Sequence, residues 1–271
     1  MESRLVKVFS PPPAPLSNFG KFAPVSGLVT AARYLTIVPL PGRPGAPPLA
    51  LGRAAGWFPV VGLALGVALA VLDHWLVRLF PALLAALLTV TMWKILTGGL
   101  HLDGLADCLD GLGGRTPEHR RDIMRDSRIG TFGAVGLILV LMIEIVALSG
   151  LEPGLRWRAL IAAPVIGRAT PPLLARVFAP ARAEGEGAGF AAAVGRVGAL
   201  VAVLIALNVA LAAVGGTGLA AALGALGVAL AAARFLTGRV GGLTGDVLGA
   251  VVEIAELTVI LVMAAWAGAR P

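Results

Sequence analysis

The sequence predicts an all-α, polytopic integral membrane protein: one helical bundle of about seven transmembrane helices, with a possible N-terminal interfacial helix. Hydrophobic residues make up 58% of the 271 residues and charged residues only 14%, whereas a soluble domain has about 25% charged residues. The chain also holds 36 glycines and 19 prolines. Both are commoner in transmembrane helices than in soluble ones, and small residues allow such helices to pack closely.

Apolar runs long enough to cross a bilayer, which takes about 20 residues, recur along the chain. The predicted spans are residues 59–80, 83–100, 132–150, 159–178, 197–215, 218–236 and 246–268. The stretch GLVTAARYLTIVPLP at 27–41 is apolar but short and ends in prolines, so we expect an interfacial or re-entrant helix there. Asp73 and His74 are expected at a membrane surface. Prolines interrupt the first 25 residues where a signal peptide would be hydrophobic, which predicts a cytoplasmic tail at 1–25 and a single transmembrane domain at 26–271.

The basic residues predict the orientation. Both the N-terminal tail and the segment 101–131 are rich in Arg and Lys, and two predicted spans separate them. Both therefore fall on one side, which the positive-inside rule makes the cytoplasm, together with the loops near 179–196 and 237–245. We interpret the net charge of +7 as a topology signal and not as nucleic-acid binding. The expected location is the inner (plasma) membrane, in a multi-pass arrangement.

Three aspartates stand at the start of a predicted helix in GGLHLDGLADCLDGLGG at 98–114. Asp103, Asp107 and Asp110 have the spacing i, i+4 and i+7, which places them on one stripe of a helix. Three carboxylates on one stripe repel one another, so the pattern favours a hard divalent cation with oxygen ligands. The alternative, in which the aspartates only solvate a helix end and pair with loop arginines, explains one stripe of three acids poorly. The single cysteine, Cys108, excludes an internal disulfide and a cysteine-based metal site.

A second acidic stretch, RRDIMRDSRIGTFG at 120–133, carries Asp122 and Asp126 at i, i+4. Carboxylates that hold a cation, beside arginines that grip phosphate through two hydrogen bonds, are typical of phosphoryl transfer. We predict that Asp103, Asp107 and Asp126 bind the metal, and that Asp110 completes the site or serves as general base. The predicted catalytic residues are therefore Asp110 and Asp107.

The C-terminal segment adds acids inside an apolar run, with Asp246 and Glu253 on one helix face and Glu256 one turn further on. They are predicted to wall a polar cavity or, as an equally weighted alternative, to pair structurally with Arg168 or Arg234. The residues predicted to bind substrate are His101, Arg125, Ser127, Arg128, Arg168, Asp246 and Glu253.

The motifs TGGLHLDGLADCLDGLGG at 97–114 and IMRDSRIGTFGA at 123–134 closely resemble those of the cobalamin synthase family. Further similar pieces are YLTIVPLP at 34–41, WFPVVGLALG at 57–66, GR at 167–168 and GGLTGDVLGAVVEIAE at 241–256, so the resemblance covers about 30–260. One departure is Ile37 after Thr36, where the family often has an arginine; Arg33, one turn earlier, is a candidate replacement.

The resemblance implies that the transmembrane domain is catalytic and transfers a substituted phosphate with the help of Mg²⁺. A hydroxyl of α-ribazole, or of α-ribazole 5′-phosphate, attacks the cobinamide-linked phosphorus of adenosylcobinamide-GDP, and GMP leaves. The product is adenosylcobalamin or its 5′-phosphate. The implied partners are these two substrates and membrane lipid, without nucleic acid; homo-oligomerisation is left open.

Two other functions are compatible with parts of the pattern. A CDP-alcohol phosphotransferase also has an Asp-Gly motif and paired acids, but it would need Ala-Arg where this chain has Ala106 and Asp107, and a glycine at the position of Glu118. A cation-coupled transporter would place an acidic site at the membrane midplane, whereas these acids stand at a helix mouth among arginines.

Overall fold

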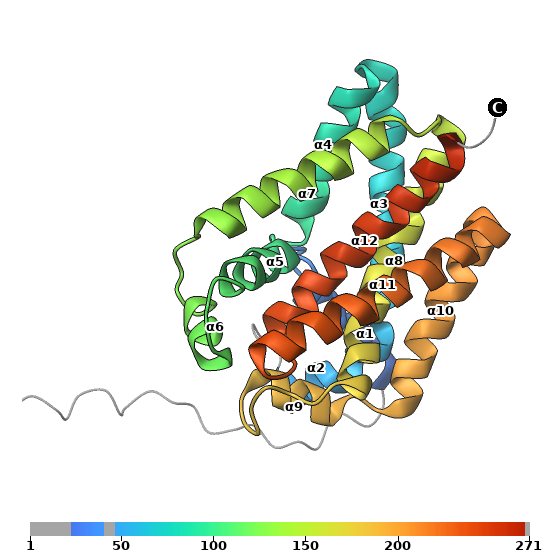
Figure 1. Cartoon of the computed structure of the whole chain (residues 1–271). Helices are drawn as coiled ribbons and strands as arrows, with labels where there is room; N and C mark the ends of the chain where they lie inside the picture. The colour runs from blue at the N-terminus through green and yellow to red at the C-terminus, as the bar shows by residue number, and fades with distance from the viewer. Residues whose placement is uncertain (1–22, 41–46, 269–271) are drawn as a thin grey trace, which may run out of the picture.

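The computed structural model describes residues 23–40 and 47–268, and within them the chain is all-α, as predicted (Figure 1). Its long helices coincide with the seven predicted spans. In chain order they are α3 (Phe58–Leu79), α4 (Ala82–Leu96), α7 (Thr131–Ser149), α8 (Pro153–Val177), α10 (Arg196–Val214), α11 (Gly216–Val240) and α12 (Gly245–Gly268). The N-terminal tail lies almost entirely outside the described residues.

Length and composition alone identify five of the described helical segments as membrane spans, or six if α4 and the following helix α5 (Leu100–Gly111), bent by 91°, count as one. The two predicted spans that do not qualify by themselves are α4 and α8. Helix α4 has only 15 residues. Helix α8 has 25 residues but contains three prolines in its interior and four arginines, of which Arg168 lies near its middle. Because α3, α10, α11 and α12 surround α8, other helices rather than lipid cover its polar groups.

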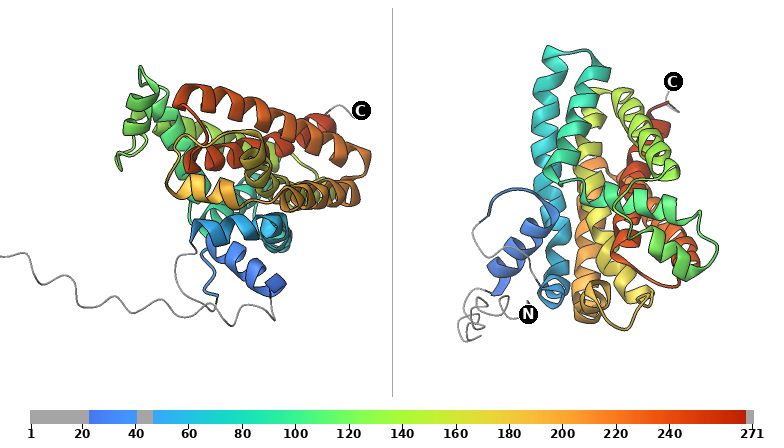
Figure 2. Two further views of the ribbon diagram at one scale, coloured as in Figure 1. Left: turned by 90° about the horizontal axis from the view of Figure 1, so that it is seen from below. Right: turned by 90° about the vertical axis from the view of Figure 1, so that its left-hand side faces the viewer.

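The short helices gather at one end of the bundle (Figures 1 and 2). They are α1 (Ala23–Leu35), α2 (Pro48–Ala54) with the 3-10 turn Ala55–Trp57, α6 (Pro117–Ile123) and α9 (Glu186–Ala193). Helix α1 occupies the segment predicted to be interfacial, and its 13 residues are too few to span a bilayer, which takes about 20. After α1 the chain meets the end of α4, where the backbone N–H of Ile37 donates to the carbonyl of Leu96 at 2.9 Å.

Glycines allow the central helices to approach closely. A Cβ atom on Gly66 of α3 would lie only 2.7 Å from the carbonyl oxygen of Leu160 on α8, and one on Gly62 would collide with the backbone of Pro164. Alanines fill much of the remaining core. The bundle tolerates many glycines because small residues at the helix contacts allow the backbones to pack closely.

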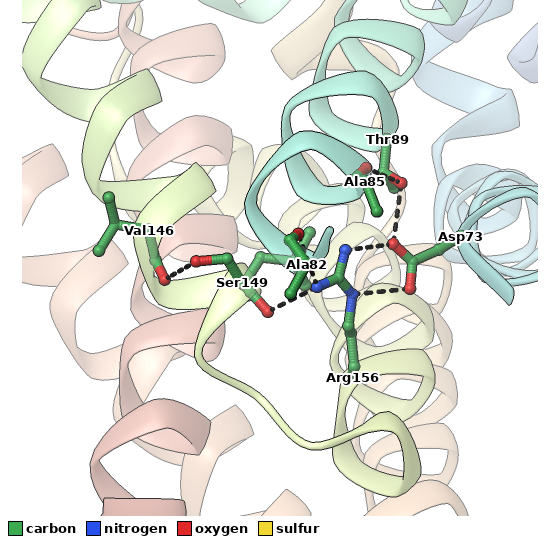
Figure 3. Close-up of polar contacts among 8 residues, drawn as sticks. Asp73, Ala82, Ala85, Thr89, Val146, Ser149 and Arg156 are labelled. Carbon is green, nitrogen blue, oxygen red and sulfur yellow. Dashed lines mark hydrogen bonds and ion pairs between the residues drawn. The ribbon is translucent and has the colours of Figure 1, made fainter. Parts of the chain in front are cut away.

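A buried ion pair joins α3 to α8 at the end away from the short helices (Figure 3). Arg156 donates to both carboxylate oxygens of Asp73, at 2.6 and 2.7 Å, and Thr89 of α4 donates to the same carboxylate at 2.9 Å. This contact leaves Asp73 only 3% exposed, while its neighbour His74 is exposed; the expectation that the two residues lie at a membrane surface stays a prediction. Removing one partner of such a pair costs about 3–5 kcal/mol because the other charge stays buried.

Candidate active site

A break between α4 and α5 creates the acidic helix. Gly98 and Gly99 have φ angles of 62° and 68°, in the left-handed region that residues with a Cβ avoid. The backbone N–H of Gly99 donates to the carbonyl of Lys94 at 2.9 Å, which closes the turn. The chain therefore leaves α4 sideways, and α5 lies across the neighbouring helices instead of continuing α4 (Figure 1).

Helix α5 crosses the start of α12 at two glycines. A Cβ atom on Gly104 would lie 2.7 Å from the carbonyl oxygen of Asp246 and 3.0 Å from its Cα, and one on Gly249 would lie 3.3 Å from the Cα of His101. Only glycine allows this approach at position 104. The crossing brings Asp246 to the predicted aspartate stripe, because Asp103 and Asp246 both lie close enough to Asp107 to repel its carboxylate.

The three aspartates of the stripe have different surroundings. Within the described residues, the carboxylates of Asp103 and Asp107 accept no hydrogen bond and form no ion pair; Asp103 is exposed and Asp107 is half-buried. Asp110 instead accepts hydrogen bonds from the backbone N–H groups of Gly130 at 2.7 Å and Gly133 at 2.8 Å. Its carboxylate thereby caps the first turn of α7, where a negative charge is favourable.

The second acidic pair lies at the surface, in α6 and the connection to α7. Asp126 pairs with Arg128 at 2.6 Å, and this hydrogen-bonded guanidinium lowers the pKa of Asp126 to about 2. Asp122 pairs with Arg125 at 3.4 Å, and Ser127 is exposed. In the described parts of the chain, no three His, Cys, Asp or Glu side chains converge closely enough to hold a metal ion. The structure therefore does not bring Asp126 together with Asp103 and Asp107, and the predicted ligand set stays a prediction.

A pocket of about 200 Å³ opens beside Asp246. Three segments far apart in the sequence line it: residues 121–125 of α6 and its C-terminus, residues from 180 to 188 after α8 and at the start of α9, and 243–246 before and at the start of α12. Backbone hydrogen bonds from Leu243 to Ala179 at 2.8 Å and from Ala181 to Leu243 at 3.0 Å hold the second and third segments together. The side chain of Arg121 donates to the carbonyl of Val240 and so attaches α6 to the end of α11.

The charges of this pocket suit a phosphate-bearing ligand. Its charged lining residues are three arginines, Arg121, Arg125 and Arg182, and two acids, Glu184 and Asp246; Arg125 and Arg182 are exposed. Arginine binds phosphate oxygens through its planar fork of N–H donors. Sequence reasoning missed Arg182. The available signal was that the loop at 179–196 was predicted on the same side as the acidic motifs.

Other predicted substrate-binding residues are enclosed in the bundle. The ammonium of Lys94 lies 2.7 Å from a carboxylate oxygen of Glu253 and 3.2 Å from one of Glu144, and Arg168 forms an ion pair with Glu256. These residues are at most 8% exposed. His101 is 4% exposed, and its Nδ1 has no hydrogen-bond partner. The geometry at Glu256 matches the structural-pairing alternative, with Arg168 and not Arg234 as its partner.

The donor chemistry at the α5–α12 crossing fits a hard divalent cation. Asp103, Asp107 and Asp246 supply only oxygen atoms, and a cation bound to two of them would relieve the repulsion between their carboxylates. Mg²⁺ in particular is usually held by one or two carboxylates and by substrate phosphates, with water completing its shell. The adjoining arginine-lined pocket would place such phosphates beside Asp246.

Comparisons with known proteins agree along nearly the whole chain. The family model of cobalamin-5-phosphate synthase matches residues 27–264. An adenosylcobinamide-GDP ribazoletransferase from Roseiflexus sp. (strain RS-1) is 37% identical over 247 residues, 90% of each chain. Those of Bradyrhizobium diazoefficiens and Herpetosiphon aurantiacus are 38% and 39% identical over 89% of this chain, and over 94% and 97% of their own lengths. No solved structure matches.

Proposed function

The chain belongs to the cobalamin-5-phosphate synthase family, and we propose here how its site performs the reaction of that family. It is a multi-pass membrane transferase, an adenosylcobinamide-GDP ribazoletransferase, which catalyses the last assembly step of the cobalamin nucleotide loop. A hydroxyl of α-ribazole, or of its 5′-phosphate, forms a bond to the cobinamide-linked phosphorus. The bond from that phosphorus to the GMP oxygen breaks, and GMP leaves with the electron pair.

The observation that carries the proposal is the contact between the acidic crossing and the arginine-lined pocket, which share Asp246. We assign the diphosphate of adenosylcobinamide-GDP to this pocket, held by Arg125 and Arg182. The ion pair between Arg125 and Asp122 is long and exposed, so its loss on substrate binding has a small cost. Arg121 is already committed to Val240 and Glu118, and we assign it the task of shaping the pocket.

We assign the metal to Asp103 of α5 and Asp246 of α12, whose carboxylates lie near enough to repel each other. When bound, Mg²⁺ neutralises charge on the phosphoryl oxygens. Both of these acids repel the carboxylate of Asp107, and we assign to one of its oxygens the acceptance of the proton of the attacking hydroxyl. Asp126 remains a candidate further ligand from its place in the motif. Asp110, whose two oxygens already bind the backbone of α7, is better suited to holding that helix than to proton transfer.

Release of the nucleotide product tests the function directly. Purified protein supplied with adenosylcobinamide-GDP and α-ribazole is expected to release GMP, and to release no CMP from a CDP-alcohol. Release of CMP instead would favour the phospholipid-type alternative. Ion movement into proteoliposomes without either product would favour a transporter.

The substitution Arg125→Lys is expected to raise the Michaelis constant for adenosylcobinamide-GDP by about 10-fold, because an ammonium cannot form the two parallel hydrogen bonds of a guanidinium. The same change at Arg182 is expected to act similarly. Arg78, an exposed arginine near the end of α3, serves as the control and should tolerate lysine. Steady-state kinetics against each substrate gives the answer, and equal tolerance at all three positions would remove the phosphate-binding assignment.

We propose that the pocket faces the cytoplasm. Both substrates are large and polar, so they reach the site from an aqueous phase. Helix α6, the α8–α9 connection and the end of α11 lie at one end of the bundle (Figure 1), and each of these segments carries arginine.

Labelling of single cysteines checks this orientation. Arg115 lies at the pocket end and Gly154 at the start of α8, and both are exposed. In a Cys108→Ala background, a membrane-impermeant maleimide added to intact cells is expected to label a cysteine at 154 and not one at 115. The reverse pattern would overturn the orientation. Labelling of both positions after the cells are permeabilised is the control for reactivity.

A further inference from the structure

Lys94 occupies a buried position one turn before the break that produces the acidic helix. Its ammonium hydrogen-bonds Glu253 of α12 at 2.7 Å and lies 3.2 Å from Glu144 of α7. The same ammonium forms a cation–π contact with the ring of Trp93, 4.6 Å from the ring centroid. One side chain of α4 therefore attaches two other helices, although the mechanism above uses none of these residues.

Helices α12 and α7 are each attached a second time, on the other side of the break. Helix α12 meets α5 where Asp246 lies against Gly104, and α7 meets α5 through the hydrogen bonds of Gly130 and Gly133 to Asp110. From Glu253 to Asp246 is seven residues, or about 10 Å along α12. Each helix is thus held at two separate points by the bent pair α4–α5, which restricts sliding of α5 along it.

We propose that Lys94 is a positioning residue for the acidic site: its ion pairs with Glu253 and Glu144 hold the α4–α5 bend on α12 and α7 and so set the separation of Asp103 and Asp246. The inference rests on the proposed function, in which these two aspartates hold the metal. A metal site needs its ligands within about 0.5 Å of their working positions, which supporting contacts must supply. The buried ion pairs of Lys94 join three helices, α4, α7 and α12, and charges held in this way move little, so they are suited to this task.

A buried ion pair at the other end of α4 provides a matched control. Arg156 and Asp73 also join helices through a buried, doubly hydrogen-bonded contact, and Arg156 in addition donates to the carbonyl of Ala82 at the start of α4 (Figure 3). This pair lies at the opposite end of α4 from Lys94. Its loss should destabilise the bundle without displacing α5.

The test compares Lys94→Met and Glu253→Gln with Arg156→Met. Lys94→Met leaves two carboxylates uncompensated and is the variant at risk of not folding. Glu253→Gln is milder, because Glu144, Glu253 and Glu256 face only two cations, Lys94 and Arg168, in the described bundle. Mn²⁺ binding to the purified protein is measured from the loss of the free-ion electron paramagnetic resonance signal, alongside kcat, KM and the unfolding temperature.

We expect both variants of the Lys94 pair to bind Mn²⁺ about 10- to 100-fold more weakly and to lose kcat in similar proportion, as is usual when a residue supporting metal ligands is removed. Lys94→Arg should restore most of the affinity, since it keeps the charge. Arg156→Met is expected to lower the unfolding temperature and to leave Mn²⁺ binding unchanged. Mn²⁺ affinity equal to wild type in folded Glu253→Gln overturns the positioning role. An equal loss in Arg156→Met also overturns it, because the effect would then be general destabilisation.

Asp103→Asn separates this inference from the proposed function. If Asp103→Asn abolishes Mn²⁺ binding while the Lys94 and Glu253 variants bind normally, the metal assignment stands and the positioning role fails. If Asp103→Asn itself binds Mn²⁺ like wild type, the metal assignment is the part that fails.

Discussion

The substitution Asp103→Asn is expected to lower turnover by about 10²-fold or more. This is the loss typically seen when one preorganised electrostatic contact to the transition state is removed. The carboxylate of Asp103 carries no hydrogen bond or ion pair within the described residues, so the substitution removes a charge without disrupting a packing contact. The KM for α-ribazole should change little. The measurement is kcat for GMP release, with the unfolding temperature confirming that the protein is intact.

Two further acids make this prediction specific. Asp107→Asn is expected to lower kcat to a similar extent while Mn²⁺ binding persists, because we assign Asp107 to proton transfer. Glu152→Gln, an exposed acid preceding α8 at the other end of the bundle, should behave as wild type. Near-normal turnover of well-folded Asp103→Asn would contradict the metal assignment. The aspartates would then only solvate the end of a helix.

Removal of divalent cations is expected to reduce GMP release to background, and added Mg²⁺ should restore it. The physical reason is that Asp103, Asp107 and Asp246 place negative charge where the substrate brings its own phosphates, and without a cation this repulsion opposes binding and reaction alike. The protein is stripped with EDTA, freed of the chelator and assayed across Mg²⁺ concentrations.

A binding measurement makes the metal experiment independent of turnover. A cation that binds the folded site and not the unfolded chain raises the unfolding temperature as its concentration increases. We expect Mg²⁺ to raise that temperature in wild type and not in Asp103→Asn. Full activity in the chelator-treated protein, with no thermal shift, would contradict a metal-dependent mechanism.

The sequence predicted that the three aspartates share one helix, but it did not predict their separate roles. Asp103, Asp107 and Asp110 share a helix as their spacing indicated, because helical periodicity is a local property. Their separate tasks were not predictable from spacing. Asp110 differs from its neighbours only because the start of α7 lies against it and offers two backbone N–H groups. Asp246 joins the stripe only because Gly104 lets α12 approach.

The partners of the buried acids Glu253 and Glu256 also could not be predicted from the sequence. An acid inside an apolar run indicates a partner or a polar cavity, and the sequence left both open for Glu253 and Glu256. The structure supplies partners, Lys94 and Arg168, from helices α4 and α8. Pairing between residues more than eighty positions apart depends on which helix faces which, and hydropathy carries no such information.

By itself the sequence determined the class of protein, the positions of the long helices, the acidic motifs and, through their resemblance, the family. These follow from composition, from the length of apolar runs and from local periodicity, which depend only on residues close together in the sequence. Only the tertiary structure decided that α4 breaks at Gly98 and Gly99, that α8 is buried among other helices, and that Arg125, Arg182 and Asp246 share one pocket. Each of these depends on packing between segments distant in the chain, where small residues set how closely two helices approach and therefore which side chains meet.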